Sequence, residues 1–516
     1  MNVAIIGAGI SGLVAAHRLR TRLGAGARIT LLEQRDRVGG VLRTVDLAGT
    51  AFDVGAEAYL ARRPELPGLL AELGLSAVHP TAASATIRAA GRTRPLPGGT
   101  LLGVPGRAAV LDGLLSAAGL AAVAAEPDRP LRWEPGADVA IGALLRDRFG
   151  DELPDRLTDP LLGGVYAGRV DALGLRATIP ALAAALDAGA PSLTAAADAA
   201  TTPARRDTRT PKPRLAGDDA RVGASVRASR GLRAQAGGGP AGGGPGGGGP
   251  ADGGPGGGAA AGGTAGGPVF GAVRGGYGVL LDALLAAARP EVRLGVTVRG
   301  IERRADGWRL VLGPTTAPEA LDVDAVVLAV PAPALARLLA PVASGAARAA
   351  GEIELASSAV VALAYRAADA AGLPPTSGAL VAAGEPLHVK GVTHSSNKWA
   401  HLGADGLVRL RASLGRFGEA ATLQVDDAEL VARVRGDLAA LTGVTADPVA
   451  VHVQRWGGGL PQYGVGHLDR VAAIESGLPD GLAVAGAALH GVGVPACVGT
   501  ARAAADRITL IVRSGT

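Results

Sequence analysis

Residues 3–12 read Val3-Ala4-Ile5-Ile6-Gly7-Ala8-Gly9-Ile10-Ser11-Gly12. The short apolar run leads into glycines spaced Gly-x-Gly-x-x-Gly, and a second apolar run follows at residues 29–32. This order predicts a strand, a tight turn, a helix and a second strand, with the helix N-terminus facing a pyrophosphate. Glu33 lies 21 residues after Gly12, where a carboxylate accepts hydrogen bonds from ribose hydroxyls. The stretch therefore predicts an α/β protein with a Rossmann-type dinucleotide-binding domain.

A second glycine stretch, Arg37-Val38-Gly39-Gly40-Val41-Leu42-Arg43-Thr44, comes directly after the acidic residue. It resembles the second glycine motif of the amine-oxidase-like flavoproteins. Two adjacent glycines let the backbone pass close to a cofactor, and Arg43 can donate charge-assisted hydrogen bonds to its phosphates. We therefore expect FAD in preference to NAD.

The composition excludes several classes of site. Cys497 is the only cysteine, so we expect no disulfide, thiolate zinc site or iron–sulfur cluster, and no other metal site. The formal net charge is +5, but residues 203–236 contain nine Lys or Arg and three Asp, so the remaining residues are close to neutral. The length predicts roughly two to four domains, and we expect no binding to nucleic acid.

No segment of the sequence is typical of export or of a membrane span. A strand follows Met1-Asn2 directly, and the most apolar stretch, residues 108–125, is interrupted by Asp112. This stretch is also shorter than the roughly 20 residues that a spanning helix requires. We expect a cytoplasmic protein with at most peripheral contact with a membrane.

Several further strings resemble the FAD-dependent protoporphyrinogen and coproporphyrinogen oxidases of haem synthesis. They are residues 51–64, 94–97, 101–105, 159–168, 395–399 and, as the most specific string, Arg455-Trp456-Gly457-Gly458-Gly459-Leu460-Pro461-Gln462-Tyr463. The family usually has Gly-Pro where this chain has Gly55-Ala56. The resemblance covers roughly 450 residues and implies a mixed-sheet substrate domain and a helical inserted domain beside the FAD-binding domain.

The resemblance and the composition together divide the chain into six segments. The FAD-binding domain is expected in three parts, residues 1–85, 269–334 and 451–516. Residues 86–202 are expected to form a helical domain that covers the substrate cavity and faces the membrane, and residues 335–450 the mixed-sheet substrate domain. Between them, residues 203–268 are rich first in Arg and then in Gly and Pro, and we expect this insertion to be disordered.

The residues expected to contact FAD come from both ends of the chain and from two points between. They are Gly7, Ala8, Gly9, Ile10, Ser11, Gly12, Glu33, Gln34, Gly39, Gly40, Val41, Arg43, Gly55, Ala56, Glu57, Ala58, Val298, Trp399, Gly486, Val492, Gly493 and Val494. The resemblance implies that the backbone of Val298 contacts the adenine and that Trp399 lies near the flavin ring, although a buried core tryptophan explains Trp399 equally well. A C-terminal helix from Ala496 is expected to stabilise the negative charge that develops on the reduced flavin.

Four arginines are the candidates for pairing with substrate carboxylates: Arg62, Arg63, Arg94 and Arg176. Solvated surface charge is the alternative explanation for each of them. No catalytic side chain is assigned, because flavin N5 accepts the hydride. His467 and His490 have no obvious carboxylate or metal partner in the sequence, and we expect both to be structural.

The resemblance implies oxidation of coproporphyrinogen III to coproporphyrin III, with dioxygen as the electron acceptor. Protoporphyrinogen IX is the alternative substrate. An amine oxidase would share the glycine motifs but not the string at residues 455–463, and a non-catalytic flavin-binding scaffold would use the insertion to hold an anionic partner. The oligomeric state and the haem-pathway partner are left open.

Overall fold

The computed structural model describes residues 1–201 and 268–514. The insertion expected at residues 203–268 lies outside the described residues except for Pro268. Within the described ranges, no helix is both long enough and apolar enough to cross a bilayer.

A five-stranded parallel sheet is the centre of the part formed by the two ends of the chain. Its order is β12 (Glu291–Arg293), β2 (Arg28–Leu32), β1 (Asn2–Ile6), β16 (Ala325–Leu328) and β22 (Leu482–Val484). Every neighbouring pair is parallel. The last four residues of β1 and all of β16 and β22 are buried, as expected for strands covered on both faces. The predicted Rossmann-type fold is confirmed.

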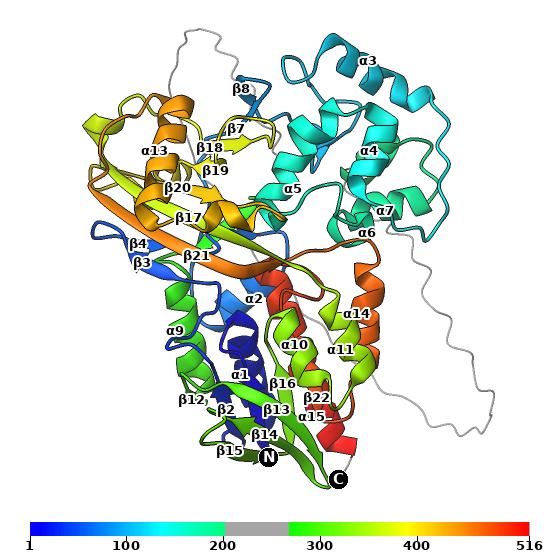
Figure 1. The fold of residues 1–516 in the computed structure, drawn as a ribbon, viewed down its shortest axis with the longest axis vertical. Coiled ribbons are helices and arrows are strands. Elements are labelled where there is room, and N and C mark those ends of the chain that lie inside the picture. Colours follow the sequence, from blue (N-terminus) through cyan, green and yellow to red (C-terminus); the bar gives the residue numbers. More distant parts are fainter. Residues whose placement is uncertain (202–267, 515–516) are drawn as a thin grey trace, which may run out of the picture. The chain divides into compact units, whose positions relative to one another are not determined.

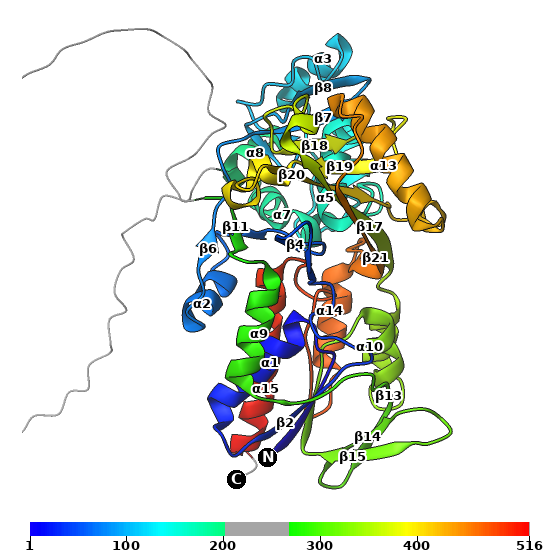
Figure 2. The ribbon, with the colours of Figure 1, turned by 90° about the vertical axis from the view of Figure 1, so that its left-hand side faces the viewer.

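Helices cover one face of this sheet. Helix α1 (Ile10–Leu23) packs against α9 (Tyr277–Ala288) and α15 (Val494–Ser514), and all three lie on the same side of β2 in Figure 2. Val3 and Ile5 of β1 belong to this core, whereas Ala4 and Ile6 belong to the core on the opposite face. The alternation follows from strand geometry, in which successive side chains point to opposite faces.

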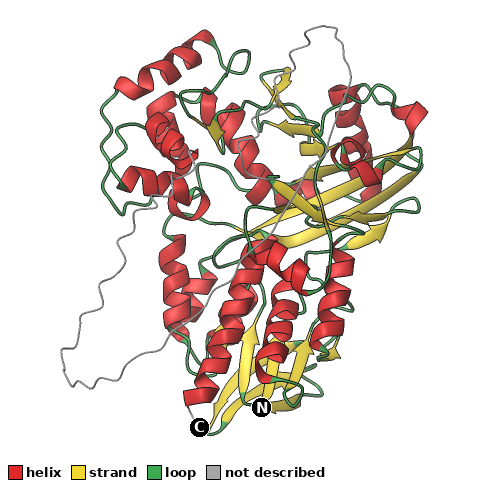
Figure 3. Cartoon of the chain, turned by 180° about the vertical axis from the view of Figure 1, so that it is seen from behind, coloured by secondary structure: helices red, strands yellow, loops and turns green. Residues whose placement is uncertain are grey.

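The opposite face of the parallel sheet is covered by a small antiparallel sheet and three helices. These elements are β13 (Val298–Arg304), β14 (Gly307–Leu312), β15 (Glu319–Val323), α10 (Ala332–Leu339), α11 (Ser344–Gly351) and α14 (His467–Ser476). Figure 3, which views the molecule from behind, shows strands and helices packed together at the end of the molecule where both termini lie.

A seven-stranded mixed sheet forms the second large element of the fold. Its order is β21 (Ala450–Pro461), β17 (Leu355–Arg366), β20 (Leu407–Leu414), β19 (Val389–Thr393), β18 (Gly378–Val381), β7 (Ala85–Ala89) and β8 (Arg92–Pro95). Only the β18–β7 pair is parallel. Helix α13 (Asp427–Thr442) packs on one face, and its first turn is capped by the Asp426 carboxylate, which accepts from the Glu429 amide at 2.7 Å.

Residues 85–95 differ from the expectation that a helical domain begins at residue 86. They form β7 and β8, which extend the mixed sheet, and the helices begin only at residue 117. The parallel pairing of β7 with β18 joins residues almost 300 positions apart, from Gly378↔Ala85 to Val381↔Arg88. Local sequence patterns do not reveal so distant a partner, and strands of four or five residues give a weak periodic signal.

The helical part that follows has its own core. It comprises α3 (Ala117–Ala125), α4 (Ile141–Phe149), α5 (Asp159–Tyr166), α6 (Leu175–Thr178), α7 (Pro180–Asp187) and α8 (Leu193–Thr201). The remaining short strands and α-helices of the described chain are β3 (Thr44–Asp46), β4 (Ala51–Asp53), β5 (Tyr59–Leu60), α2 (Glu65–Glu72), β6 (Ala77–Val78), β9 (Thr100–Leu101), β10 (Val104–Pro105), β11 (Phe270–Val273) and α12 (Ser395–Lys398). Figure 1 shows α3, α4, α6 and α7 grouped on one side of the strands of the mixed sheet.

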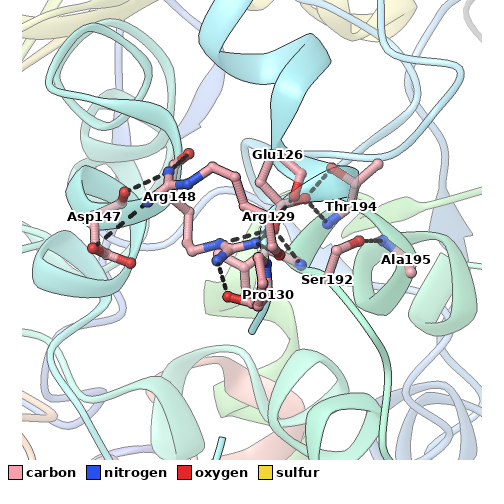
Figure 4. A network of polar contacts seen from close by, with 9 residues as sticks. Glu126, Arg129, Pro130, Asp147, Arg148, Ser192, Thr194 and Ala195 are labelled. Carbon is pink, nitrogen blue, oxygen red and sulfur yellow. Dashed lines mark hydrogen bonds and ion pairs between the residues drawn. The ribbon is translucent and has the colours of Figure 1, made fainter. Parts of the chain in front are cut away.

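A buried ion pair joins α4 and α8 to the end of α3. Glu126 is 0% exposed and Arg148 is 3% exposed. The Arg148 guanidinium donates to Glu126 Oε1 at 2.9 and 3.0 Å, and Oε1 also accepts from the Leu193 amide at 2.8 Å. Glu126 Oε2 accepts from the amide and the hydroxyl of Thr194 (Figure 4). Both charges are therefore fully partnered in the interior, as burial requires.

Candidate functional site

The first glycine turn lies at the carboxyl end of β1. Gly7 has φ = 101°, and a Cβ on Gly12 would lie 1.9 Å from the Gly7 carbonyl oxygen. Both positions therefore require glycine. Helix α1 begins at Ile10, its N-cap Gly9 provides no side-chain hydrogen bond, and its first turn has no acidic residue. The free amide groups and the helix dipole at this end favour a bound anion.

The second glycine stretch packs directly on the first. The Gly39 amide donates to the Ala8 carbonyl at 2.8 Å, and a Cβ on Gly40 would lie 3.1 Å from Gly9 Cα. A Cβ on Gly9 itself would meet only Gly40 Cα, at 3.8 Å. The described protein atoms therefore leave room beside Gly9 at the start of α1. This is where the phosphates of a dinucleotide bind in Rossmann folds, so the residues present fit the pyrophosphate of FAD.

Glu33 is held at the end of β2. Its side chain is 8% exposed, Oε2 accepts from the Ala8 amide at 2.8 Å, and Oε1 accepts from the Arg35 amide at 3.0 Å. The Glu33 carbonyl accepts from the Val296 amide at 2.9 Å, which brings the start of β13 and Val298 to the same edge of the sheet. The structure thus brings together the residues expected at the ribose and the adenine. Gln34 is exposed.

The stretch from Gly55 to Glu57 is fixed by the backbone of the second glycine stretch and by the mixed sheet. A Cβ on Gly55 would lie 2.0 Å from the Val41 carbonyl oxygen. Arg411 of β20 donates to the Gly55 carbonyl at 2.6 Å and to the Asp53 carbonyl at 3.3 Å. On the other side, Arg43 donates to Gln454 Oε1 of β21 at 2.7 Å. These contacts join the FAD-binding part to the mixed sheet.

Trp399 is 1% exposed and lies against the Gly55–Glu57 stretch, because its indole N–H donates to Glu57. Glu57 Oε2 also lies 3.5 Å from Lys398 Nζ and 3.8 Å from Arg411 Nη1. Burial favours the neutral acid, yet the two cations and the indole hold the pKa of Glu57 below its usual value. Glu57 therefore stays ionised at neutral pH. Trp399 is both a buried residue and a neighbour of the expected cofactor residues.

Asp53 is the other buried carboxyl group beside this stretch. Its Oδ1 accepts from the Thr44 hydroxyl at 2.5 Å and from the Tyr277 amide at 3.1 Å. Burial raises the pKa of Asp53 from 3.8 to about 6, because these hydrogen bonds and Arg411 offset only part of the lost hydration. Asp53 therefore changes its protonation state near pH 6.

The Asp53→Asn variant is expected to remove a pH dependence of stability. A carboxyl group whose pKa is raised on folding stabilises the fold fully below its unfolded pKa of 3.8, and this contribution is lost as the pH rises through about 6. Between about pH 4.5 and about pH 7, we expect the free energy of unfolding of the variant to gain about 2 kcal/mol relative to that of the starting protein.

The measurement is urea unfolding at several pH values. Asp306→Asn, in an exposed turn, is the matched control and is expected to follow the starting protein. A constant difference between Asp53→Asn and the starting protein across this range would contradict the raised pKa.

The C-terminal motif returns to the carboxyl end of the parallel sheet after β22. Gly486 has φ = 139° and donates its amide to the Thr500 hydroxyl at 3.1 Å. Tyr463, from the most family-specific string, donates to the Ala487 carbonyl at 2.5 Å and accepts from the Gly491 amide at 2.8 Å. Helix α15 then begins at Val494. The string therefore fixes the loop that leads into this helix N-terminus.

His467 and His490 have different surroundings. His467 is 1% exposed, stacks on the Tyr463 ring with centroids 3.9 Å apart, and has Nε2 2.9 Å from the Leu489 carbonyl oxygen. His490 does have a carboxylate partner, contrary to the expectation from the sequence, since its Nε2 lies 2.8 Å from Glu475 Oε1. Glu475 lies on α14, so only the tertiary contact reveals the pair. No group of His, Cys, Asp and Glu in the described chain is arranged to hold a metal ion.

Two of the four candidate arginines already have carboxylate partners within the chain. Arg176 donates to both oxygens of Asp187 at 2.8 Å, and Arg63 pairs with Glu65 at 2.7 Å. Arg62 and Arg94 are exposed. Their binding to substrate stays a prediction. Sequence reasoning missed Arg411, although the alternation of Arg409, Arg411 and Ser413 with apolar residues marks one polar face of β20.

Comparisons with known proteins agree with this site. Residues 10–509 match the family described as flavin containing amine oxidoreductase. The coproporphyrinogen III oxidase of Mycobacterium leprae (strain TN) is 43% identical over 506 residues, which cover 98% of this chain and 97% of that protein. A solved structure from Exiguobacterium sp. 255-15, provisionally named protoporphyrinogen oxidase, has a TM-score of 0.76 at 27% identity and covers 99% of this chain and 98% of its own.

The cyclohexylamine oxidase of Brevibacterium oxydans IH-35A has a TM-score of 0.65 at 15% identity, covers 99% of each chain, and bears on the fold alone. The family match spans residues 10–509 and includes α1, Glu33, the second glycine stretch and most of the C-terminal helix. The chain is therefore an FAD-containing member of the flavin containing amine oxidoreductase family.

Proposed function

We propose that this protein oxidises coproporphyrinogen III to coproporphyrin III in haem biosynthesis, with dioxygen as the electron acceptor. The observation that carries the proposal is the 43% identity to a coproporphyrinogen III oxidase over 98% of the chain. Identity on this scale includes the mixed sheet and the helical part as well as the FAD-binding part, so it bears on the substrate side of the molecule. The proteins of Mycobacterium tuberculosis and Mycobacterium bovis with the same name are 44% identical.

When bound, FAD supplies the acceptor for a hydride from a meso carbon of the substrate. The role of this chain's own residues is to bind and orient the cofactor and the substrate. Arg411 fixes the Gly55 loop through its carbonyl group, and Lys398 and Trp399 hold Glu57 beside it. The buried apolar residues Phe52, Val54 and Trp456 belong to the same cluster as Trp399. Such a site suits hydride transfer, which needs close orientation and a dry environment but no acid–base dyad.

The proposal is tested by giving the purified holoenzyme each porphyrinogen and following porphyrin fluorescence. We expect kcat/KM for coproporphyrinogen III to exceed that for protoporphyrinogen IX by about tenfold or more, since one well-formed pair between a cation and a carboxylate is worth about 1.5–3 kcal/mol. We also expect turnover in air and little beyond a single turnover under argon.

Other outcomes identify the alternatives. A kcat/KM for protoporphyrinogen IX equal to or higher than that for coproporphyrinogen III would indicate that protoporphyrinogen IX is the substrate. The name of the Exiguobacterium structure favours this alternative. Oxidation of primary amines without porphyrin formation would indicate an amine oxidase. A folded holoprotein without any turnover would indicate a flavin-binding scaffold.

A further inference from the structure

The face of the mixed sheet that carries Arg411 is directed at the FAD-binding part. On β17, the residues opposite Arg411 and Ser413 are Ala362 and Val360. Both belong to the apolar cluster that includes Trp399 and Phe52 and Val54 of the FAD-binding part. We call this side of the sheet the Arg411 face. The other side carries Leu410, Ala412 and Leu414 and is covered by α13.

Lys390 lies on the neighbouring strand β19 at a β-bulge. The register shifts between Val389, which is opposite Leu414, and Gly391, which is opposite Ser413. Val389 belongs to the core under α13, whereas Gly391 lies on the Arg411 face. A bulge inserts one extra residue and re-aims its side chain. Lys390 and Gly391 therefore stand together opposite Ser413, which lies on the Arg411 face. Arg416 and Arg411 are also the charged groups that act on Lys390.

Lys390 is a buried cation without a counter-ion. Its residue is 6% exposed, and among the described residues its side chain has no hydrogen-bond or ion-pair partner. Burial, together with the two arginines, lowers the pKa of Lys390 from 10.5 to about 8. Lysines are almost never buried unless they are paired, because the charged form loses its hydration.

The carboxylates near the three cations Lys390, Arg411 and Arg416 are already paired with other cations. Glu57 lies between Lys398 and Arg411. At the other end of the group, Asp159 Oδ1 lies 3.5 Å from Arg169 Nε, and Glu419 Oε1 lies 4.0 Å from Arg169 Nη1. Arg416 is 9% exposed and donates to the Val381 carbonyl at 3.1 Å. Lys390 is therefore flanked by two further cations and lacks an acid of its own.

Lys390 has two small neighbours on this face, and the larger Leu380 of β18 pairs with the first of them, Gly391. Gly391 is the next residue, and Ser413 stands opposite it on β20. Helix α5 of the helical part packs against β18 and β19, where Gly164 faces Leu380. Strand β19, which carries Lys390, therefore lies between β20, which carries Arg411, and β18, and α5 packs against both β18 and β19.

We infer that Lys390 binds a carboxylate of the substrate and that Arg411 and Arg416 add to the positive field that attracts it. The inference rests on the proposed function, since porphyrinogens bring propionate groups to this face. It explains why a lysine is buried here without a partner from the chain. A bound carboxylate would supply the missing counter-ion, and its attraction to a largely buried ammonium group is screened less than at the surface.

The test compares Lys390→Met, which keeps the length of the side chain and removes the charge, with Lys390→Arg. Binding of coproporphyrin III to the holoenzyme is followed by quenching of porphyrin fluorescence. We expect Lys390→Met to weaken binding about tenfold or more and to lower kcat/KM for coproporphyrinogen III by a similar factor, mainly through KM. Lys390→Arg is expected to stay within about threefold of the starting protein.

Two further readouts separate binding from a structural role. Removing an unpaired buried cation should leave the melting temperature unchanged or raise it, with full FAD content. The tetramethyl ester of coproporphyrin III, which has no carboxylates, is expected to bind equally to Lys390→Met and to the starting protein. Arg92→Met, an exposed cation on β8 of the same sheet, is the matched control and should change neither affinity.

Unchanged binding of coproporphyrin III by Lys390→Met would overturn the inference, and so would a parallel loss for the tetramethyl ester or a lower melting temperature. Failure of the proposed function gives a different result. In that case the starting protein itself does not turn over coproporphyrinogen III, or it uses protoporphyrinogen IX equally well or better.

Discussion

Replacing Gly9 with valine is expected to give a folded protein that retains less than about a tenth of the FAD of the starting protein. Gly9 has φ = −72° and ψ = −179°, a conformation that valine adopts readily. Its Cβ would meet only Gly40 Cα, at 3.8 Å, so the protein itself leaves room for a side chain. That room is where the pyrophosphate approaches the start of α1, and a branched side chain would occupy it.

The measurement is the ratio of flavin to protein after purification. The flavin is released by acid precipitation and quantified by the visible absorption of the supernatant. Gly26→Val is the matched control, because a Cβ on Gly26 would meet no atom within 4 Å and this residue lies at the far end of α1. Gly12→Val would not serve, since its side chain would collide with the Gly7 carbonyl group and disturb the turn itself. Full FAD content in a folded Gly9→Val protein would contradict the proposed path of the pyrophosphate.

Replacing Glu126 with alanine is expected to lower the free energy of unfolding by about 3–5 kcal/mol. The change leaves the Arg148 guanidinium, 3% exposed, without a negative partner, and it removes the acceptor of the Leu193 and Thr194 amides (Figure 4). An uncompensated buried charge is far more costly than a lost surface pair, because it keeps the desolvation penalty without the attraction.

Urea unfolding provides the measurement, with circular dichroism as the probe. Glu291→Ala breaks the exposed pair with Arg28, whose atoms are 2.9 Å apart, and is expected to cost less than about 1 kcal/mol. The double variant Glu126→Gln with Arg148→Met removes both charges and is expected to recover part of the loss. A loss from Glu126→Ala no larger than that from Glu291→Ala would contradict this account of the pair.

The parts of the site that sequence reasoning predicted depend on short-range geometry. Gly7, Gly9 and Gly12 lie within one turn between a strand and a helix, where the need for positive φ or for close backbone contact is local. The apolar runs that become β1, β2 and β16 are continuous because parallel strands are buried on both faces. Windows of about ten residues are therefore long enough to detect these features in the sequence.

The features that were missed depend on contacts between distant residues. Residues 85–95 join a sheet through β18, and His490 finds its carboxylate on α14. The sequence made Arg176 a candidate for binding a substrate carboxylate. In the structure, its guanidinium group donates to both carboxylate oxygens of Asp187. A list of charged residues does not say which of them the fold has already paired.

The amino-acid sequence by itself determined the cofactor class, the parallel sheet and the glycine turns beside it, because glycine spacing and hydrophobic periodicity encode local backbone geometry. Only the tertiary structure decided which charges are available to a substrate. In the sequence, Lys390 is one polar residue within a short strand, and nothing distinguishes it from a solvated lysine. A bulge in β19, the burial of its side chain and the pairing of the surrounding carboxylates with other cations make it a cation without a partner. The physical reason is that electrostatic pairing and desolvation depend on distances in space, which the chain defines only once it has folded.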